Sequence, residues 1–242
     1  MNRLCMACLL TIINLQGMAA AAAVSGEAKL HWNGEAGLGY VATTGNTRTS
    51  TFNAKADLTH EKEQWRNNLV ANTLYTKNSD IRTAEKYFVS GQTNYRYSGP
   101  MSLFGRASYE DDRFSGYEYQ GTATLGLGYR FLAARPSMTL DLEAGGGIKA
   151  YQEKGRNSIT ETIFRLAGKY VWDFREKSKF SQKLSSDIGE QFTVSKSITS
   201  LTAQLMGNFA INLGYTVKYT SRVPENKKKT DTETTINLVY VF

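Results

Sequence analysis

Residues that could do acid–base, nucleophilic or metal chemistry are few in this chain of 242 residues. It holds two histidines, His31 and His60, and two cysteines, Cys5 and Cys8. Neither histidine is expected beside a serine on an adjacent strand end, so acyl transfer lacks its general base. Two isolated histidines also make a poor transition-metal site. We therefore expect no catalytic residue, no metal site and no bound cofactor.

A group of acidic residues supplies the enzyme alternative. Asp111, Asp112 and Glu118 lie close together in the sequence, and paired carboxylates can act as general acid and base. A membrane-embedded hydrolase or acyltransferase is the activity that they would serve. Because adjacent carboxylates in a loop are usually only solvated, we expect a non-enzymatic protein.

The elements that must position any site are β-strands. From Gly34 onward, apolar and polar residues alternate in segments of about nine to fifteen residues between turn-rich clusters. No stretch after the N-terminus has the roughly 18 consecutive apolar residues of a helical membrane span. The alternation predicts twelve strands, near 34–43, 49–59, 65–76, 85–97, 101–110, 117–131, 137–150, 159–174, 179–190, 198–210, 212–222 and 233–242.

The apolar faces of these strands favour a membrane barrel. Small residues such as Ala36, Ala54 and Gly91 lie on them and would pack a soluble β-sandwich poorly. Aromatic residues cluster toward the strand ends, as in the girdles that barrels place at the lipid–water boundary. We expect an all-β, transmembrane antiparallel up-and-down β-barrel of about 12 strands. A soluble exported β-rich binding module is the alternative.

The first 23 residues differ in composition from the rest. Arg3 makes the start basic, an apolar run follows, and five alanines end the segment at Ala23. These features describe a secretory signal peptide, with a buried N-terminal helix as the alternative. We expect a signal peptide over 1–23, a short periplasmic segment over 24–33 and the barrel over 34–242. The remaining chain would contain no cysteine, as is common in bacterial outer-membrane proteins.

The polar faces of the strands would line the lumen of this barrel. Their positive and negative charges nearly balance, whereas a selective channel would line its bore with an excess of one sign. Balanced charges can pair with one another, so we expect a narrow or obstructed lumen. Passage of small solutes and a structural role both stay open. The candidate lumen charge network is Lys55, Arg66, Arg96, Arg106, Arg130, Asp141, Glu143, Arg165, Lys169, Asp187 and Lys218.

The connections after odd strands are expected to be longer than those after even strands, as in barrels with outer loops and short inner turns. Basic side chains in the outer loops are candidates for binding the phosphates of lipopolysaccharide. Lys227, Lys228 and Lys229 form the candidate site, and Lys196 is expected in another outer loop. Nucleic acid is not an expected partner of an exported chain.

Two stretches resemble a known family. They are "GLGYVATTGNTRTSTFNAKADLTHEKEQWR" (37–66), which contains Gly-Asn-Thr at 45–47, and "YEDDRFSGYEYQGTATLGLGYRFL" (109–132), which contains Asp-Arg-Phe and Gly-x-Gly-Tyr. Over about 37–242 the chain resembles the YdiY-like family of salt-induced outer membrane proteins, domain of unknown function 481. The resemblance implies a barrel of the Gram-negative outer membrane with a link to osmotic or salt stress, and it brings no catalytic residue.

The chain ends inside a predicted strand, with apolar residues at alternate positions. In a closed barrel the last strand must pair with the first, because open edges in lipid leave backbone groups unsatisfied. This ending also resembles the signal that the bacterial barrel-assembly machinery recognises. The expected partners are thus outer-membrane lipids and that machinery, while the sequence leaves the oligomeric state open. The candidate assembly signal is Ile236, Leu238, Tyr240 and Phe242.

Overall fold

The computed structural model describes residues 32–43, 49–79, 81–132, 135–224 and 227–242. The expected signal peptide, all but the end of the expected periplasmic segment, and His31 lie outside the described residues. Within the described part of the chain, no helix is long and apolar enough to cross a membrane.

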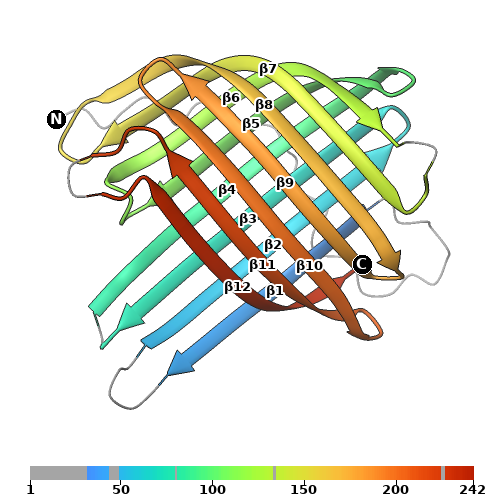
Figure 1. The fold of residues 1–242 in the computed structure, drawn as a ribbon, viewed down its shortest axis with the longest axis horizontal. Coiled ribbons are helices and arrows are strands. Elements are labelled where there is room, and N and C mark those ends of the chain that lie inside the picture. Colours follow the sequence, from blue (N-terminus) through green and yellow to red (C-terminus); the bar gives the residue numbers. More distant parts are fainter. Residues whose placement is uncertain (1–31, 44–48, 80, 133–134, 225–226) are drawn as a thin grey trace, which may run out of the picture. The chain divides into compact units, whose positions relative to one another are not determined.

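Twelve antiparallel strands follow one another around a closed barrel (Figure 1). Each strand pairs with its neighbours in sequence, and β1 closes the ring by pairing with β12. The expected up-and-down barrel is confirmed, and a two-sheet sandwich is wrong because the sheet closes on itself. The strands are β1 (Trp32–Thr43), β2 (Thr49–Lys62), β3 (Trp65–Asn78), β4 (Ile81–Ser98), β5 (Met101–Asp112), β6 (Tyr117–Phe131), β7 (Met138–Glu153), β8 (Ser158–Arg175), β9 (Ser178–Gly189), β10 (Thr193–Met206), β11 (Phe209–Thr220) and β12 (Thr230–Val241).

The barrel has two unlike ends. We call the end that carries Trp32 and Phe242 the terminal end, and the opposite one the far end. Most connections at the terminal end are two-residue turns, such as Gly99–Pro100 and Gly207–Asn208, whose glycines have φ of 49° and 56°. Glycine adopts this left-handed conformation without steric cost. The longest connection between two strands, 221–229, is at the far end, and its residues 225–226 lie outside the described residues.

The structure corrects the strand register near the C-terminus. The sequence predicts a strand near 198–210, whereas β10 spans Thr193–Met206 and the turn falls at Gly207. The alternation that includes Val194, Lys196 and Ile198 begins earlier than expected. Because these residues share one face of β10, Lys196 lies on the inner face instead of in an outer loop.

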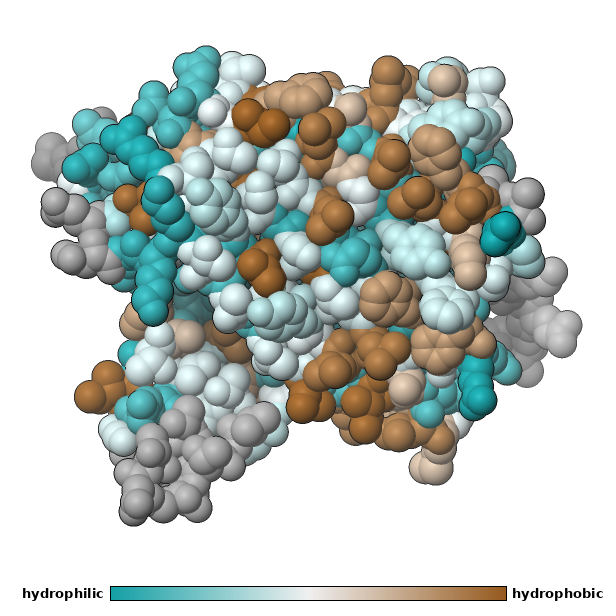
Figure 2. All heavy atoms as spheres, viewed as in Figure 1, coloured by the Kyte–Doolittle hydropathy of each residue, from teal (hydrophilic) through white to brown (hydrophobic). Residues whose placement is uncertain are grey.

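The outer wall of the barrel is apolar. Leu38, Leu125 and Ile236 have 62%, 73% and 56% of their surface exposed, which would be unfavourable in water and is suited to lipid. Figure 2 shows brown apolar side chains over the visible wall, while teal polar ones gather toward the far end. Aromatic pairs mark the terminal end, among them Trp65–Tyr95 and Trp172–Phe174.

The interior of the barrel is polar. The most deeply buried side chains include Lys149, Asn212 and Asn237, each at most 2% exposed. Buried polar groups require partners, and Asn212 donates to the hydroxyls of Ser200 and Thr202 at 2.7 Å. The fold therefore positions a polar, charge-lined lumen inside an apolar wall.

Candidate functional site: a lumen crossed by ion pairs

Ion pairs cross the lumen between strands that are not neighbours. Lys183 Nζ on β9 lies 2.9 Å from Asp57 Oδ2 on β2. Lys179 Nζ, also on β9, lies 3.4 Å from Glu35 Oε2 on β1. Arg66 on β3 reaches Asp141 on β7 at 3.4 Å. Such pairs span the bore instead of lying along its wall, so they narrow it.

Further pairs join adjacent strands and hold these bridging side chains in place. Lys55 Nζ lies 2.6 Å from Glu35 Oε1, on the carboxylate that Lys179 also approaches. Arg130 forms a fork on Asp141, with Nε and Nη2 at 2.7 and 3.1 Å from its two oxygens. A two-contact guanidinium–carboxylate pair is geometrically specific. Two carboxylates of the interior are thus shared, Glu35 between Lys55 and Lys179 and Asp141 between Arg66 and Arg130.

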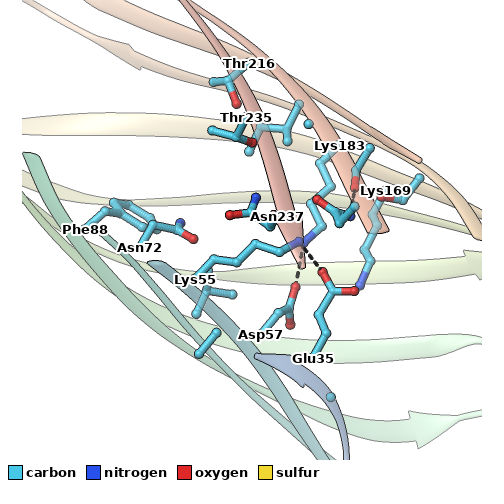
Figure 3. Close-up of a pocket in the computed structure, with 18 of the residues that line it drawn as sticks. Glu35, Lys55, Asp57, Asn72, Phe88, Lys169, Lys183, Thr216, Thr235 and Asn237 are labelled. Carbon is cyan, nitrogen blue, oxygen red and sulfur yellow. Dashed lines mark hydrogen bonds and ion pairs between the residues drawn. The ribbon is translucent and has the colours of Figure 1, made fainter. Parts of the chain in front are cut away.

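A cavity of about 430 Å³ remains beside this network. It extends from Asn33 and Asp173, which are exposed at the terminal end, to Phe88 and Lys196. In Figure 3, Lys55, Glu35 and Asp57 point toward one another, and Lys169 and Lys183 approach them from the opposite wall. A volume of this size is in the range of small-ligand pockets.

Toward the far end three buried aromatic side chains pack against one another, and we call them the aromatic plug: Tyr117, Tyr151 and Phe192. Their ring centroids are 4.9 to 5.9 Å apart, and each residue is at most 4% exposed. The Lys149 ammonium lies 3.5 Å from the centre of the Phe192 ring and 2.6 Å from Glu161 Oε1. This cation–π contact and buried ion pair anchor the plug to the wall.

Above the plug, connections from opposite sides of the ring meet. The Lys227 Nζ donates a hydrogen bond to the Phe114 carbonyl oxygen at 2.8 Å. The Tyr117 hydroxyl donates to the Arg222 carbonyl oxygen at 3.4 Å. The β11–β12 connection therefore reaches the β5–β6 connection, which stands half a turn away in the strand order. We call this contact the far-end bridge.

A comparison with models of protein families assigns the chain to a family. Residues 36–242 match the model described as protein of unknown function, DUF481. The chain belongs to the DUF481 family. The Escherichia coli (strain K12) protein YdiY is 30% identical over 214 residues, which cover 88% of this chain and 84% of YdiY. The expected YdiY-like family is confirmed.

A solved porin structure supports the fold of this DUF481 chain. The NanC porin superposes with a TM-score of 0.54 at 8% identity, over 87% of this chain and 99% of that porin. The KdgM porin gives a TM-score of 0.46 at 11% identity, over 87% and 99% of the two chains. At these identities the likeness concerns the fold alone.

The structure brings most of the candidate lumen charges together. Arg165 pairs with Asp187 at 2.7 Å, Lys218 pairs with Glu110, and Glu143 accepts from Gln92 at 2.6 Å. Other candidates have no carboxylate within 4.0 Å among the described residues: Arg96, which is exposed near the terminal end, Arg106 and Lys169.

Sequence reasoning missed the plug and part of the network. Tyr117, Tyr151 and Phe192 come from two strands and a connection, and no local pattern marks them as neighbours. Lys179 and Lys196 were detectable, because they alternate with Phe180 and with Ser195 on opposite faces of β9 and β10. The misplaced start of β10 explains the absence of Lys196 from the candidate set, whereas Lys179 lay inside the expected strand 179–190 and was passed over.

Asp112, one of the acidic residues of the enzyme alternative, is held in a turn. Asp112 accepts from the backbone N–H groups of Phe114 and Ser115 at 3.0 and 3.1 Å, which is the hydrogen bonding of a turn. His60 packs against Trp32 with ring centroids 4.7 Å apart and ring planes tilted by 42°. Among the described residues, no three of His, Cys, Asp or Glu group as metal ligands.

Proposed function

We propose that this protein is a non-enzymatic barrel of the Gram-negative outer membrane, with a lumen that is obstructed in the resting state. The observation that carries the proposal is the far-end bridge over the aromatic plug. Lys227 and Phe114 belong to connections on opposite sides of the ring, so their contact lies across the opening. The cross-lumen ion pair between Lys183 and Asp57 narrows the bore below it.

The terminal end faces the periplasm in this proposal, and the far end faces outward. Short turns at the terminal end and longer connections at the far end are the usual arrangement in outer-membrane barrels. The alternating residues of β12 would then present the assembly signal to the barrel-assembly machinery. Its members are all at least 42% exposed on the outer wall: Ile236, Leu238, Tyr240 and Phe242.

Lipopolysaccharide is the proposed partner at the far end. Lys228 and Lys229 are exposed, whereas Lys227 is engaged with Phe114. Exposed cations attract phosphate groups. The variant Lys228→Gln/Lys229→Gln should bind lipopolysaccharide more weakly in a pull-down at low salt. Unchanged binding would reject this part of the proposal.

Passage of small solutes is the second candidate function. The cavity of about 430 Å³ supports this candidate, because it reaches the terminal end. A route through the protein would require the plug and the far-end bridge to move. A role in osmotic or salt stress fits such movement, because ionic strength weakens partly exposed ion pairs.

Swelling of protein-containing liposomes in small sugars separates the two candidates. An obstructed barrel should give swelling rates indistinguishable from liposomes without protein. Rates that rise with the amount of barrel and fall with sugar size would establish solute passage and reject the obstructed state.

A further inference from the structure

Four lysines on four consecutive strands form a ladder on the inner wall: Lys169 on β8, Lys183 on β9, Lys196 on β10 and Lys218 on β11. Lys169 stands directly opposite Lys183, and Lys196 directly opposite Lys218. The register partner of Lys183 is Ile198, two positions from Lys196. Like charges opposite each other destabilise a sheet, so this arrangement carries a cost.

Only two of the four ladder lysines form a direct ion pair with a described carboxylate. Lys183 pairs with Asp57 at 2.9 Å, and Lys218 pairs with Glu110. Among the described residues, neither Lys169 nor Lys196 has a carboxylate oxygen within 4.0 Å. The Lys196 ammonium instead lies 4.8 Å from the Phe88 ring centre. Each pair of lysines thus contains one ammonium without a direct ion pair to a described carboxylate.

The cavity beside the ladder carries an excess of positive charge. Its described lining includes Lys169, Lys183 and Lys196, and in total seven Lys and Arg side chains against five Asp and Glu. Asn237 also lines it, is 1% exposed, and has a side-chain oxygen without a hydrogen-bond partner in the described structure. This amide oxygen accepts hydrogen bonds, so a water or an N–H or O–H group of a ligand would satisfy it, and an oxyanion oxygen would not.

We propose that this cavity binds a small oxyanion, a phosphate or carboxylate group, against the lysine ladder. Lys169 and Lys196 supply the ammonium groups that the protein's own carboxylates leave free. Ammonium–oxyanion hydrogen bonds are charge-assisted and strong. Asn237 and Asn72, which project into the same cavity (Figure 3), offer amide groups to the rest of a small organic anion.

The oxyanion site goes beyond the obstructed-barrel proposal and does not depend on it. The cavity reaches the terminal end, so an anion can enter whether or not the far end opens. Binding measured in detergent micelles therefore tests the site, while liposome swelling tests the obstruction. One can fail without the other.

Isothermal titration of the refolded protein with inorganic phosphate, and separately with succinate, tests the oxyanion site. The buffer should be of low ionic strength, because salt screens the attraction. Both the wild-type protein and the variant Lys169→Gln/Lys196→Gln are measured. We expect saturable binding to the wild type and affinity at least about tenfold weaker in the variant, since two charge-assisted contacts are lost. Tighter binding of one probe assigns the site to phosphate or to carboxylate.

Three controls separate anion binding from folding and from net charge. Lys62→Gln removes a charge from an exposed position at the terminal end and should leave binding within about twofold. Lys169→Arg keeps the charge and should retain most of the affinity. Because the double variant relieves like-charge repulsion, its thermal unfolding temperature should not fall. Absence of saturable binding to the wild type, or equal affinity in the double variant, would overturn the proposal.

Discussion

At the scale of single residues, burial decides which charged side chains affect the stability of the barrel most. Lys149 and Glu161 form the most deeply buried ion pair, with side chains 2% and 3% exposed and Nζ 2.6 Å from Oε1. Lys149 also donates to the Phe192 carbonyl oxygen at 3.2 Å. The pair thus links the wall to the plug. Alternation could place both residues on the inner face, but it could not show that Phe192 lies above them.

Lys149→Met should destabilise the barrel by about 3–5 kcal/mol, because it leaves the Glu161 carboxylate buried without its cation. Urea unfolding followed by tryptophan fluorescence measures the change. The double variant Lys149→Met/Glu161→Gln should recover much of the loss, since no charge then remains unpaired. A double variant no more stable than the single one would contradict this account of the pair.

Asp112 is a turn residue in this structure, and its substitution should behave accordingly. Asp112→Ala removes the acceptor for two backbone N–H groups and should cost about 1 kcal/mol. Asp112→Asn retains a side-chain oxygen and should restore most of that stability. Differential unfolding of the two variants checks the assignment. Loss of a hydrolytic turnover in the folded Asn variant would instead support the enzyme alternative.

At the scale of elements, the seam between β1 and β12 is the shortest in the ring. Residues Glu35–Leu38 of β1 pair with Leu238–Val241 of β12. On its other side, β1 pairs with β2 over its whole length, from Trp32 to Thr43. Gly34 and Phe242 add two reciprocal backbone hydrogen bonds of 2.9 and 3.1 Å. The last residue therefore contributes directly to closure. A terminal strand ending on an aromatic residue was the sequence feature that predicted this pairing.

Deletion of Phe242 should impair closure of the barrel. Two backbone hydrogen bonds at about 1 kcal/mol each correspond to roughly a thirtyfold shift in the folded-to-unfolded ratio. The heat-modifiable fraction on gels reports the folded barrel. Phe209→Ala removes an exposed aromatic residue at the same end without removing backbone, and should have a smaller effect. Equal yields for the deletion and the wild type would show that Phe242 has no role in closure or assembly.

The number of strands was predictable because alternation with period two is a local signal. The boundary of β10 was not, since the turn at Gly207–Asn208 and the start at Thr193 resemble other polar stretches. This shift of a few residues moved Lys196 from a loop to the lumen. Register errors change which face a residue occupies, so they alter a candidate site more than they alter the fold.

At the scale of the whole molecule, the proposed obstruction of the lumen rests on contacts between elements that are distant in sequence. Asp57 and Lys183 are 126 positions apart, and Phe114 and Lys227 are 113 apart. Charge balance along the strands indicated an internally paired lumen. It could not identify which pairs cross the bore, because this depends on strand tilt and on the closed ring.

Ionic strength should affect the obstruction. Lys183 and Asp57 keep 34% and 26% of their side-chain surface exposed, so salt can screen their attraction. The Debye length falls from about 10 Å at 0.1 M to about 3 Å at 1 M. We therefore expect proteolysis of the far-end connections, with protease added from the outside of intact cells, to be faster at high salt. The variant Asp57→Asn should show a smaller dependence on salt than the wild type.

Planar-bilayer conductance of the refolded protein tests the central claim, that the plug and the far-end bridge obstruct the lumen. In about 0.1 M KCl, where ion pairs are less screened, the wild type should give no stable open-channel steps. The folded variant Tyr151→Ala/Phe192→Ala, which removes two of the three plug rings, should give ohmic steps, and the outward-facing control Phe164→Ala should stay silent. Stable steps of equal size in the wild type and the plug variant would contradict the account.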